Sequence, residues 1–330
     1  MHEYNAALAF DAINRLTLSC LPSPLESCQR IVEIEPNLPE LFIKRDDHLG
    51  PLVGGNKLRK LEYVFADALR QQAKTVITCG GIQSNHARIT AQTASRLGFK
   101  CILVLNGEPP DQPRANLLID RLLGTEIHYV KTREERDPLV NQIVKKHEEK
   151  GENLYKIPLG ASNEIGALGL VNAMKELALF QQKNSIEFDY LLVSTSSGGT
   201  QAGMILGKAL FGLEKLKIIG ISADNRAEQI CDAGLKAAIP IAERIGLKRA
   251  ISAKDFVIDE EHIGEGYGVP SEASIEAEKL FARHEGILLD RFYTSKTASA
   301  LLDYSRKGVF KKSDKVLFWH TGGLITLFSE

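Results

Sequence analysis

The sequence predicts an α/β protein with doubly wound, mostly parallel sheets, and two observations carry this prediction. After about residue 50, short runs rich in β-branched residues alternate with helical stretches, an order that implies right-handed crossovers between parallel strands covered on both faces. A length of 330 residues with 44% hydrophobic side chains suffices for two sizeable cores or one large open sheet. The expected strands are 75–79, 101–105, 126–130, 190–194, 217–223, 287–290 and 315–321.

The first informative segment is GGNKLRKLE, residues 54–62. Its two glycines and asparagine predict a tight loop, and the apolar periodicity of residues 57–72 predicts an amphipathic helix behind it. Lys57 then lies in the first helical turn, where the partial positive charge of the helix end disfavours a cation, and Arg59 and Lys60 add two more. Either these residues form a solvated basic helix face, or the amine at this place has a chemical use.

Ligands of doubly wound sheets bind at the carboxyl ends of the strands, and the loop CGGIQSNHAR, residues 79–88, follows one expected strand directly. Its glycines let the backbone pass close to a ligand, while Ser84, Asn85 and His86 present a hydroxyl, an amide and an imidazole at a helix N-terminus. These three polar groups at a helix N-terminus are suited to bind a carboxylate and a phenolic oxygen of a ligand. The simpler interpretation is that Ser84 or Asn85 caps the helix, and the two roles are compatible.

The loop STSSGGTQAGM, residues 194–204, joins an apolar strand to a helix and offers closely spaced hydroxyls and backbone N–H groups at the helix start. This is the arrangement that holds a phosphate. The loop has no lysine, and neither the P-loop spacing nor G-x-G-x-x-G occurs, so a small cofactor phosphate fits better than a triphosphate or a dinucleotide. A serine- and glycine-rich turn without a ligand is the competing interpretation. The candidate phosphate ligands are Ser196, Ser197, Gly198, Gly199 and Thr200.

The segment WHTGG, residues 319–323, ends the last expected strand. Thr321 places a neutral hydroxyl at that strand end, among the other loops of the site. No second histidine or carboxylate stands at ligand spacing from His320, which is therefore expected to be a packed or hydrogen-bonded core histidine. We predict no metal site.

Composition narrows the class of function. With 41 basic and 42 acidic side chains the net charge is −1, which offers no field for nucleic acid or an anionic membrane and favours a small polar substrate. No apolar run has the length of a membrane helix, and Glu3, Asp11 and Arg15 interrupt the N-terminal segment where a signal peptide is apolar, so a cytoplasmic location is expected. The five cysteines include no C-x-x-C pair and are expected to be reduced.

A phosphate-binding helix N-terminus and a lysine at another helix N-terminus are both explained by one ligand that carries a phosphate and reacts with an amine. The helix dipole and the neighbouring cations favour the neutral form of Lys57 and lower its pKa, and a neutral amine forms a Schiff base with an aldehyde. Pyridoxal 5'-phosphate (PLP) is the aldehyde that brings a phosphate. The residues therefore predict PLP as the cofactor.

The ordered motifs KRDDHLG, GGNKLRKLE, GGIQSNHAR, SSGGTQAG, GEGYGVP, YTSK and HTGG resemble the D-cysteine desulfhydrase and 1-aminocyclopropane-1-carboxylate (ACC) deaminase family from about residue 20 onward. The resemblance implies the tryptophan-synthase-like fold of PLP enzymes, fold type II, usually as a homodimer. A smaller α/β domain, residues 57–164, would be inserted into a larger PLP-binding domain, residues 1–56 and 165–330. The active site would lie at their interface.

The resemblance also implies roles for single residues. Lys57 would hold the cofactor, Asn85 would contact its 3-hydroxyl, and Ser196 to Thr200 would hold its phosphate. Thr321 would face the ring nitrogen.

On the substrate side, Ser84 and His86 would flank the carboxylate next to Asn85. Tyr267 of GEGYG and Tyr293 of YTSK would close the opposite side. The implied catalytic set is therefore Lys57, Ser84, Tyr267 and Tyr293.

Two positions separate the members of this family. ACC deaminases carry a glutamate after the second tyrosine and a glutamine after S-N, where this chain has Thr294 and His86. A carboxylate at the ring nitrogen makes the ring a stronger electron sink, whereas Thr321, with Thr294 as a second hydroxyl near the ring, leaves the pyridine neutral. Elimination of a good leaving group needs less help than opening a cyclopropane. Arg291 and Ser295 depart from the proline and glycine usual in desulfhydrases, so the substrate stays open.

The predicted activity is that of a PLP-dependent carbon-sulfur lyase, which converts D-cysteine to pyruvate, hydrogen sulfide and ammonia. Lys57 would abstract the Cα proton, with Tyr293 or Tyr267 as proton donor to the leaving group. ACC deamination to 2-oxobutanoate is one alternative. A noncatalytic PLP carrier or sensor is another, and the presence of both tyrosines and Ser84 beside Lys57 argues against it.

Overall fold

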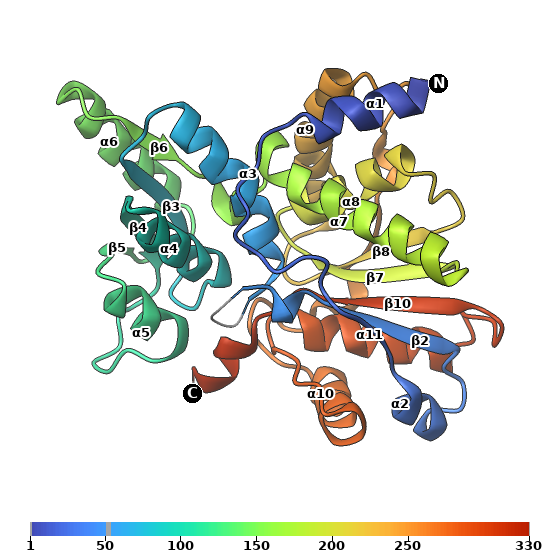
Figure 1. Cartoon of the computed structure of the whole chain (residues 1–330). Helices are drawn as coiled ribbons and strands as arrows, with labels where there is room; N and C mark the ends of the chain where they lie inside the picture. The colour runs from blue at the N-terminus through green and yellow to red at the C-terminus, as the bar shows by residue number, and fades with distance from the viewer. Residues whose placement is uncertain (1, 51–53, 330) are drawn as a thin grey trace.

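The computed structural model describes residues 2–50 and 54–329, and the strands of this part of the chain form two sheets flanked by helices (Figure 1). The six-stranded sheet has the order β1-β2-β10-β7-β8-β9 and the four-stranded sheet the order β5-β4-β3-β6. The strands are β1 (Leu25–Ser27), β2 (Glu40–Arg45), β3 (Thr75–Gly81), β4 (Lys100–Asn106), β5 (Glu126–Val130), β6 (Leu154–Lys156), β7 (Tyr190–Thr195), β8 (Lys217–Ser222), β9 (Val257–Asp259) and β10 (Lys315–His320).

Helices connect these strands. The α-helices are α1 (His2–Asp11), α2 (Gln29–Ile34), α3 (Asn56–Arg70), α4 (Asn85–Leu97), α5 (Ala115–Leu122), α6 (Arg136–Glu149), α7 (Glu164–Asn184), α8 (Gly199–Leu210), α9 (Ala227–Ile245), α10 (Glu272–Glu285) and α11 (Thr294–Arg306). Short 3-10 helices are η1 (Asp46–His48), η2 (Leu159–Ala161), η3 (Ala253–Asp255), η4 (Glu261–Ile263) and η5 (Leu324–Phe328). No helix of the described part of the chain is long and apolar enough to cross a membrane.

Both sheets are mostly parallel, which confirms the predicted fold class. Only β1 runs antiparallel to its neighbour among the described pairs. The last strand, β10, lies between β2 and β7, so Val316 is paired with Leu41 on one side and Tyr190 on the other. The strands of the four-stranded sheet fall between β2 and β7 in the chain. The domain boundaries at residues 57 and 164 stay a prediction.

The expected strand at 287–290 is wrong. This segment alternates as a strand would, with Ile287 and Leu289 buried and Leu288 exposed, but it pairs with no neighbour in the described sheets. Its last residue, Asp290, instead caps α11, because its carboxylate accepts the backbone N–H groups of residues 292, 293 and 294 at 2.9 to 3.0 Å. The alternation of apolar residues in this segment therefore predicted correctly which side chains are buried, but it did not predict whether the segment pairs with a strand.

The strand β2 was not expected, and its charged end explains why. Lys44 in this strand is buried, donates to the carbonyl of Ser23 at 2.6 Å and pairs with Glu176 at 3.2 Å. The burial of a lysine that is hydrogen-bonded and ion-paired in this way cannot be predicted from a hydrophobicity pattern, because its partners are distant in the chain. The unexpected strands β1, β6 and β9 have only three residues each.

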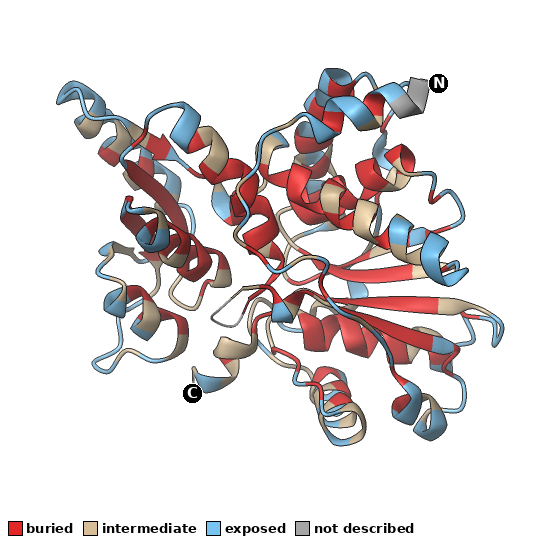
Figure 2. Cartoon of the chain, viewed as in Figure 1, coloured by how far each residue is buried: buried red, intermediate tan, exposed pale blue. Residues whose placement is uncertain are grey.

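Helix α3 lies between the two sheets and positions the site (Figure 1). Leu61 and Phe65 pack into the apolar core under the four-stranded sheet, while Tyr63 belongs to a second apolar cluster that includes residues of α7, α8 and α9. Figure 2 shows α3 and the central strands of both sheets as mainly buried, with exposed residues on the outer helices and loops. The helix that begins at Asn56 is therefore held from both sides.

Candidate active site

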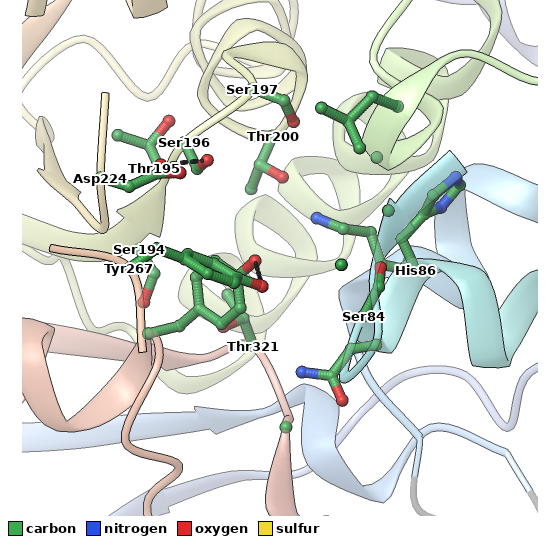
Figure 3. A pocket seen from close by; sticks show the side chains of 18 of the residues that line it. Ser84, His86, Ser194, Thr195, Ser196, Ser197, Thr200, Asp224, Tyr267 and Thr321 are labelled. Carbon is green, nitrogen blue, oxygen red and sulfur yellow. Dashed lines mark hydrogen bonds between the residues drawn. The ribbon is translucent and has the colours of Figure 1, made fainter. Parts of the chain in front are cut away.

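A cavity of about 390 Å³ opens at the carboxyl ends of strands from both sheets (Figure 3). The structure brings most of the predicted site residues together around it, although they come from six separate segments of the chain. The predicted residues that line the cavity are Lys57, Ser84, Asn85, His86, Ser196, Ser197, Gly198, Thr200, Tyr267, Tyr293 and Thr321. Gly199 and Thr294 do not line it.

The loop before Lys57 is fixed by the HTGG loop. The backbone N–H of Asn56 donates to the carbonyl of Thr321 at 3.0 Å, and Gly55 forms an isolated bridge with Gly322. A Cβ atom at Gly322 would lie 2.8 Å from the Cα of Gly55, so the two backbones approach closely only because both residues are glycines. This contact places Lys57 in the first turn of α3, as predicted.

Lys57 lies in the cavity without a carboxylate within ion-pairing distance among the described residues. Burial lowers the pKa of its ammonium from 10.5 to about 8. The direction agrees with the sequence prediction, and the cause that the structure adds is the loss of solvent around the amine. A large fraction of the amine is therefore neutral, and nucleophilic, at mildly alkaline pH.

Ser84 and Asn85 begin α4 at the cavity wall. The Ser84 hydroxyl accepts the backbone N–H of Ala87 at 3.2 Å, so the capping interpretation is correct. Its own proton remains available for a ligand. Asn85 is the first residue of the helix, and its side-chain oxygen accepts from Asn116 at 3.0 Å.

The ring of His86 is neutral and its tautomer follows from its neighbours. Thr78 donates its hydroxyl proton to the carbonyl of Ile157 at 2.9 Å, so it accepts from Nε2 of His86 at 2.8 Å. Burial, and after it two nearby lysines, lowers the pKa of His86 well below its ordinary value. Nδ1 therefore carries a lone pair, has no partner among the described residues and cannot donate to a carboxylate. At this helix start the donors are the backbone N–H groups, the Ser84 hydroxyl and the side-chain amide of Asn85.

The predicted phosphate loop runs into α8, whose N-terminus has no side-chain cap. Its hydroxyls are held from behind: Ser196 donates to Asp224 at 2.6 Å, Ser197 lies 2.7 Å from Ser162, and Thr200 accepts from Asn56 at 3.2 Å. Figure 3 shows the Ser196 to Asp224 bond at one edge of the cavity. Gly199 is packed away from the cavity, and a Cβ atom there would lie 2.7 Å from the Ser162 hydroxyl.

Lys60 is a cation of this site that sequence reasoning missed. It is fully buried, and its Nζ donates to the carbonyl of Gly160 at 3.1 Å and to Ser162 at 3.0 Å. Burial, with the charge of Lys57 as a smaller cause, lowers the pKa of Lys60 well below its ordinary value. No described carboxylate lies within ion-pairing distance. An anion at the N-terminus of α8 would supply the missing counter-charge.

The two predicted tyrosines face each other, with their hydroxyl oxygens 2.8 Å apart. Burial raises the pKa of Tyr267 to about 12 and that of Tyr293 well above its ordinary value. Both phenols therefore stay protonated and are proton donors. Arg133, from the loop after β5, pairs with Asp224 at 3.0 Å and lies 5.2 Å from the centroid of the Tyr267 ring. Arg133 and Asp224 were missed, although both follow predicted strands.

The expectation that Thr294 is a second hydroxyl near the cofactor ring is wrong, because Thr294 does not line the cavity. Its buried hydroxyl donates to Asp290 at 2.7 Å and accepts the backbone N–H of the same residue at 2.7 Å, so it serves the cap of α11. Thr321 does line the cavity. His320 is a buried core histidine, as predicted: Gly322 donates its N–H to Nδ1 and Nε2 donates to the carbonyl of Leu288. The described residues include no cluster arranged to hold a metal ion.

PLP fits this site. The cavity offers polar atoms that lack partners among the described residues, namely His86 Nδ1, Asn106 Oδ1 and Thr195 Oγ1. It also joins an uncapped helix N-terminus, an uncompensated buried lysine and a second lysine with a lowered pKa. Two open α/β sheets with this set of groups at their carboxyl edges define a PLP enzyme of fold type II.

Comparison with known proteins identifies the family. The model of the pyridoxal-phosphate dependent enzyme family matches residues 16–322, and the chain belongs to this family and uses PLP. It is 36% identical to a 1-aminocyclopropane-1-carboxylate deaminase of Rhizobium rhizogenes over 95% of each chain, and 38% identical to a putative one of Thermotoga maritima over 96% of this chain and 98% of the relative. The crystal structure of an ACC deaminase homologue superposes with a TM-score of 0.89 at 32% identity, covering 98% of this chain and 96% of that chain.

Proposed function

We propose that this PLP enzyme eliminates hydrogen sulfide from D-cysteine and so forms pyruvate and ammonia. The observation that supports this choice is the wall around Thr321. The described carboxylates that line the cavity are Glu134 and Asp224, and Asp224 is engaged by Ser196 and Arg133. Thr321 thus lies in the wall as a neutral group, which suits a reaction with a good leaving group.

The residues around the cavity divide the work. When bound, PLP supplies an electron sink for the electron pair left at Cα of the substrate. Lys57 Nζ, as a neutral amine, accepts the Cα proton. The Ser84 hydroxyl and the N-terminal N–H groups of α4 bind the substrate carboxylate. The paired phenols of Tyr267 and Tyr293 hold the proton that the departing sulfur receives.

The phosphate side is a separate binding element. The uncapped N-terminus of α8 and the hydroxyls of Ser197 and Thr200 bind the phosphate oxygens. Lys60, behind Ser162, balances their charge. This division of roles lets cofactor affinity and turnover be tested with different variants.

ACC deamination is the second candidate, and the names of the relatives favour it. Proteins named ACC deaminase or putative ACC deaminase match nearly the whole chain at 33 to 38% identity. The cavity supports the first candidate instead, because Thr321 is neutral and His86 presents a lone pair where an amide is usual in ACC deaminases. The two candidates differ in their products.

An assay with five substrates separates these functions. The holoenzyme is incubated with D-cysteine, L-cysteine, β-chloro-D-alanine, D-serine and ACC, while sulfide, pyruvate and 2-oxobutanoate are measured separately. Equal amounts of sulfide and pyruvate from D-cysteine support the proposal. Loss of all products with Lys57→Ala shows that the activity belongs to this site, and a holoenzyme inert to every compound would indicate a PLP carrier. A homodimer and a cytoplasmic location stay predictions.

A further inference from the structure

Asn116 is a buried amide, outside the predicted site, whose hydrogen-bonding groups are all used. It lies near the start of α5 and is fully buried. Its backbone N–H donates to the side-chain oxygen of Gln83 at 3.0 Å, and its Nδ2 donates to the Gln83 carbonyl at 2.8 Å and to Asn85 Oδ1 at 3.0 Å. Its Oδ1 accepts from Arg88 Nε at 2.9 Å. This side chain has no freedom to rotate without losing bonds.

The direction of these bonds is set by Arg88. A guanidinium has only donors, so the atom of Asn116 that faces Arg88 must be its oxygen. The Asn116 nitrogen is then turned toward Asn85, and only the oxygen of Asn85 can accept from it. The remaining group of the Asn85 amide is Nδ2, and Asn85 lines the cavity. The hydrogen bonds that link Arg88, Asn116 and Asn85 therefore leave Asn85 Nδ2 at the cavity wall, which is a donor and not an acceptor.

We propose that Asn116 is a positioning residue that fixes the amide of Asn85 so that its Nδ2 donates to the 3-oxygen of PLP. The inference rests on the proposed contact of Asn85 with the cofactor. A freely rotating asparagine would present either group, and its carbonyl would repel an oxygen that carries negative charge. Arg88 fixes which atom of the Asn116 amide is the acceptor. Asn116 in turn fixes the orientation of the Asn85 amide, so that Asn85 Nδ2 faces the cavity as a donor.

Asn116→Asp reverses the polarity with almost no change of shape. The introduced carboxylate still accepts from Arg88, but it has no donor for Asn85, so the Asn85 amide turns and directs its oxygen toward the cavity. We expect PLP affinity to fall by about 30-fold, against about 10-fold for Asn116→Ala, which frees the Asn85 amide without reversing it. Equilibrium dialysis of PLP with the apo-protein measures the affinity of each variant. The visible absorption band of the bound cofactor should shift more for Asn116→Asp than for Asn116→Ala.

Asp120→Asn is the matched control. Asp120 lies one turn further along α5, is equally buried and makes no side-chain hydrogen bond to another described residue. Its replacement removes a charge that acts on Arg88, but it leaves the hydrogen bond from Arg88 to Asn116, and so the order of donors and acceptors, unchanged. PLP affinity and the absorption band should stay at wild-type values, and thermal unfolding of the apo-proteins shows whether any variant is simply unfolded.

A double-mutant cycle decides the mechanism, also where Asn116→Asp does not fold. If Asn116 acts through Asn85, then Asn116→Ala weakens PLP binding about 10-fold in the wild type and hardly at all in an Asn85→Ala background. Equal losses in both backgrounds, or an Asn116→Asp protein with wild-type affinity and absorption band, would overturn the proposal. These readouts concern cofactor binding, so an enzyme that prefers ACC over D-cysteine overturns the proposed substrate and leaves this inference intact.

Discussion

The two faces of α3 differ in whether their buried basic side chains are paired with carboxylates. On one face, Arg59 is bound by Asp46 at 2.8 and 2.9 Å and by Glu176 at 2.7 and 3.0 Å. On the face that carries Lys57, which lines the cavity, neither Lys57 nor Lys60 has a carboxylate within ion-pairing distance in the described structure. Buried charges are normally paired. The Arg59 face is complete within the protein, whereas the lysine face requires an anionic ligand to be complete.

This difference also corrects the simplest interpretation of the K-x-R-K pattern, that of a solvated basic helix face. Both Arg59 and Lys60 are buried. The two carboxylates that bind Arg59 lie 13 and 117 residues away in the chain, so local sequence gives no sign of which cation is balanced. The predictions below test whether the two faces differ as this contrast requires.

The largest effect is expected at Lys57. Replacing Lys57 by alanine removes the amine that both attaches the cofactor and accepts the Cα proton, so turnover should fall by at least about 10³-fold. Because the N-terminus of α8 and Lys60 are unchanged, PLP should still bind noncovalently, which dialysis measures. In the wild type, borohydride reduction followed by peptide mapping should find PLP on Lys57. A Lys57→Ala enzyme with wild-type turnover would contradict the assignment.

Arg59 should govern stability rather than cofactor binding. Arg59→Met leaves the buried Asp46 without its ion-pair partner and Glu176 with Lys44 alone, which should lower the free energy of unfolding by about 3–5 kcal/mol. Urea unfolding of the apo-protein measures this loss. PLP affinity should change little at a temperature where the variant is folded. An Arg59→Met protein as stable as the wild type would show that the network contributes no net stability.

Lys60→Met is the matched variant on the other face, and its effect on the apo-protein should have the opposite sign. Removing an uncompensated buried cation should stabilise the apo-protein by about 1–2 kcal/mol, less the two hydrogen bonds to Gly160 and Ser162. The same change should weaken PLP binding by about 10-fold, because the phosphate loses its counter-charge. If apo-stability falls as far as with Arg59→Met, the contrast between the two faces is wrong.

The smallest effect concerns pH. With the pKa of Lys57 lowered from 10.5 to about 8, the rate of covalent PLP attachment should rise with pH and level off just above pH 8. The same shift makes the unfolded chain bind more protons than the folded one between pH 8 and 10.5, so this group's unfavourable contribution to stability is largest below pH 8 and is relieved as pH rises through that window. A stopped-flow absorbance series gives the attachment rate. A rate that still rises toward pH 10 would mean an unperturbed lysine.

Sequence patterns predicted the parts of this structure that depend on neighbouring residues. The strands that carry the motifs, the first-turn place of Lys57 and the cap at Ser84 all follow from local composition. Lys60, Arg133 and Asn116 were missed because their roles arise from contacts across the fold. Asp224 directly follows a predicted strand and Arg133 lies three residues after another, so the rule that ligands bind at strand ends, applied to every loop, would have found them.

The position of Thr294 shows a second limit. The motif places it next to Tyr293, which suggested a neighbour of the cofactor ring. In the structure its hydroxyl is committed to Asp290, a residue of a segment mistaken for a strand. The argument for a neutral ring therefore rests on Thr321 alone. A glutamate at position 294 would have to displace the cap of α11, so Thr294→Glu is expected to destabilise the protein rather than alter its specificity.

The central claim is that a cavity with Thr321 as its neutral group supports elimination from D-cysteine better than opening of a cyclopropane. The most direct test compares kcat/KM of the same holoenzyme for D-cysteine, by release of sulfide and pyruvate, and for ACC, by release of 2-oxobutanoate. We predict a higher kcat/KM for D-cysteine, with sulfide and pyruvate in equal amounts. A kcat/KM for ACC equal to or above that for D-cysteine would contradict the claim and make ACC deamination the function of this enzyme.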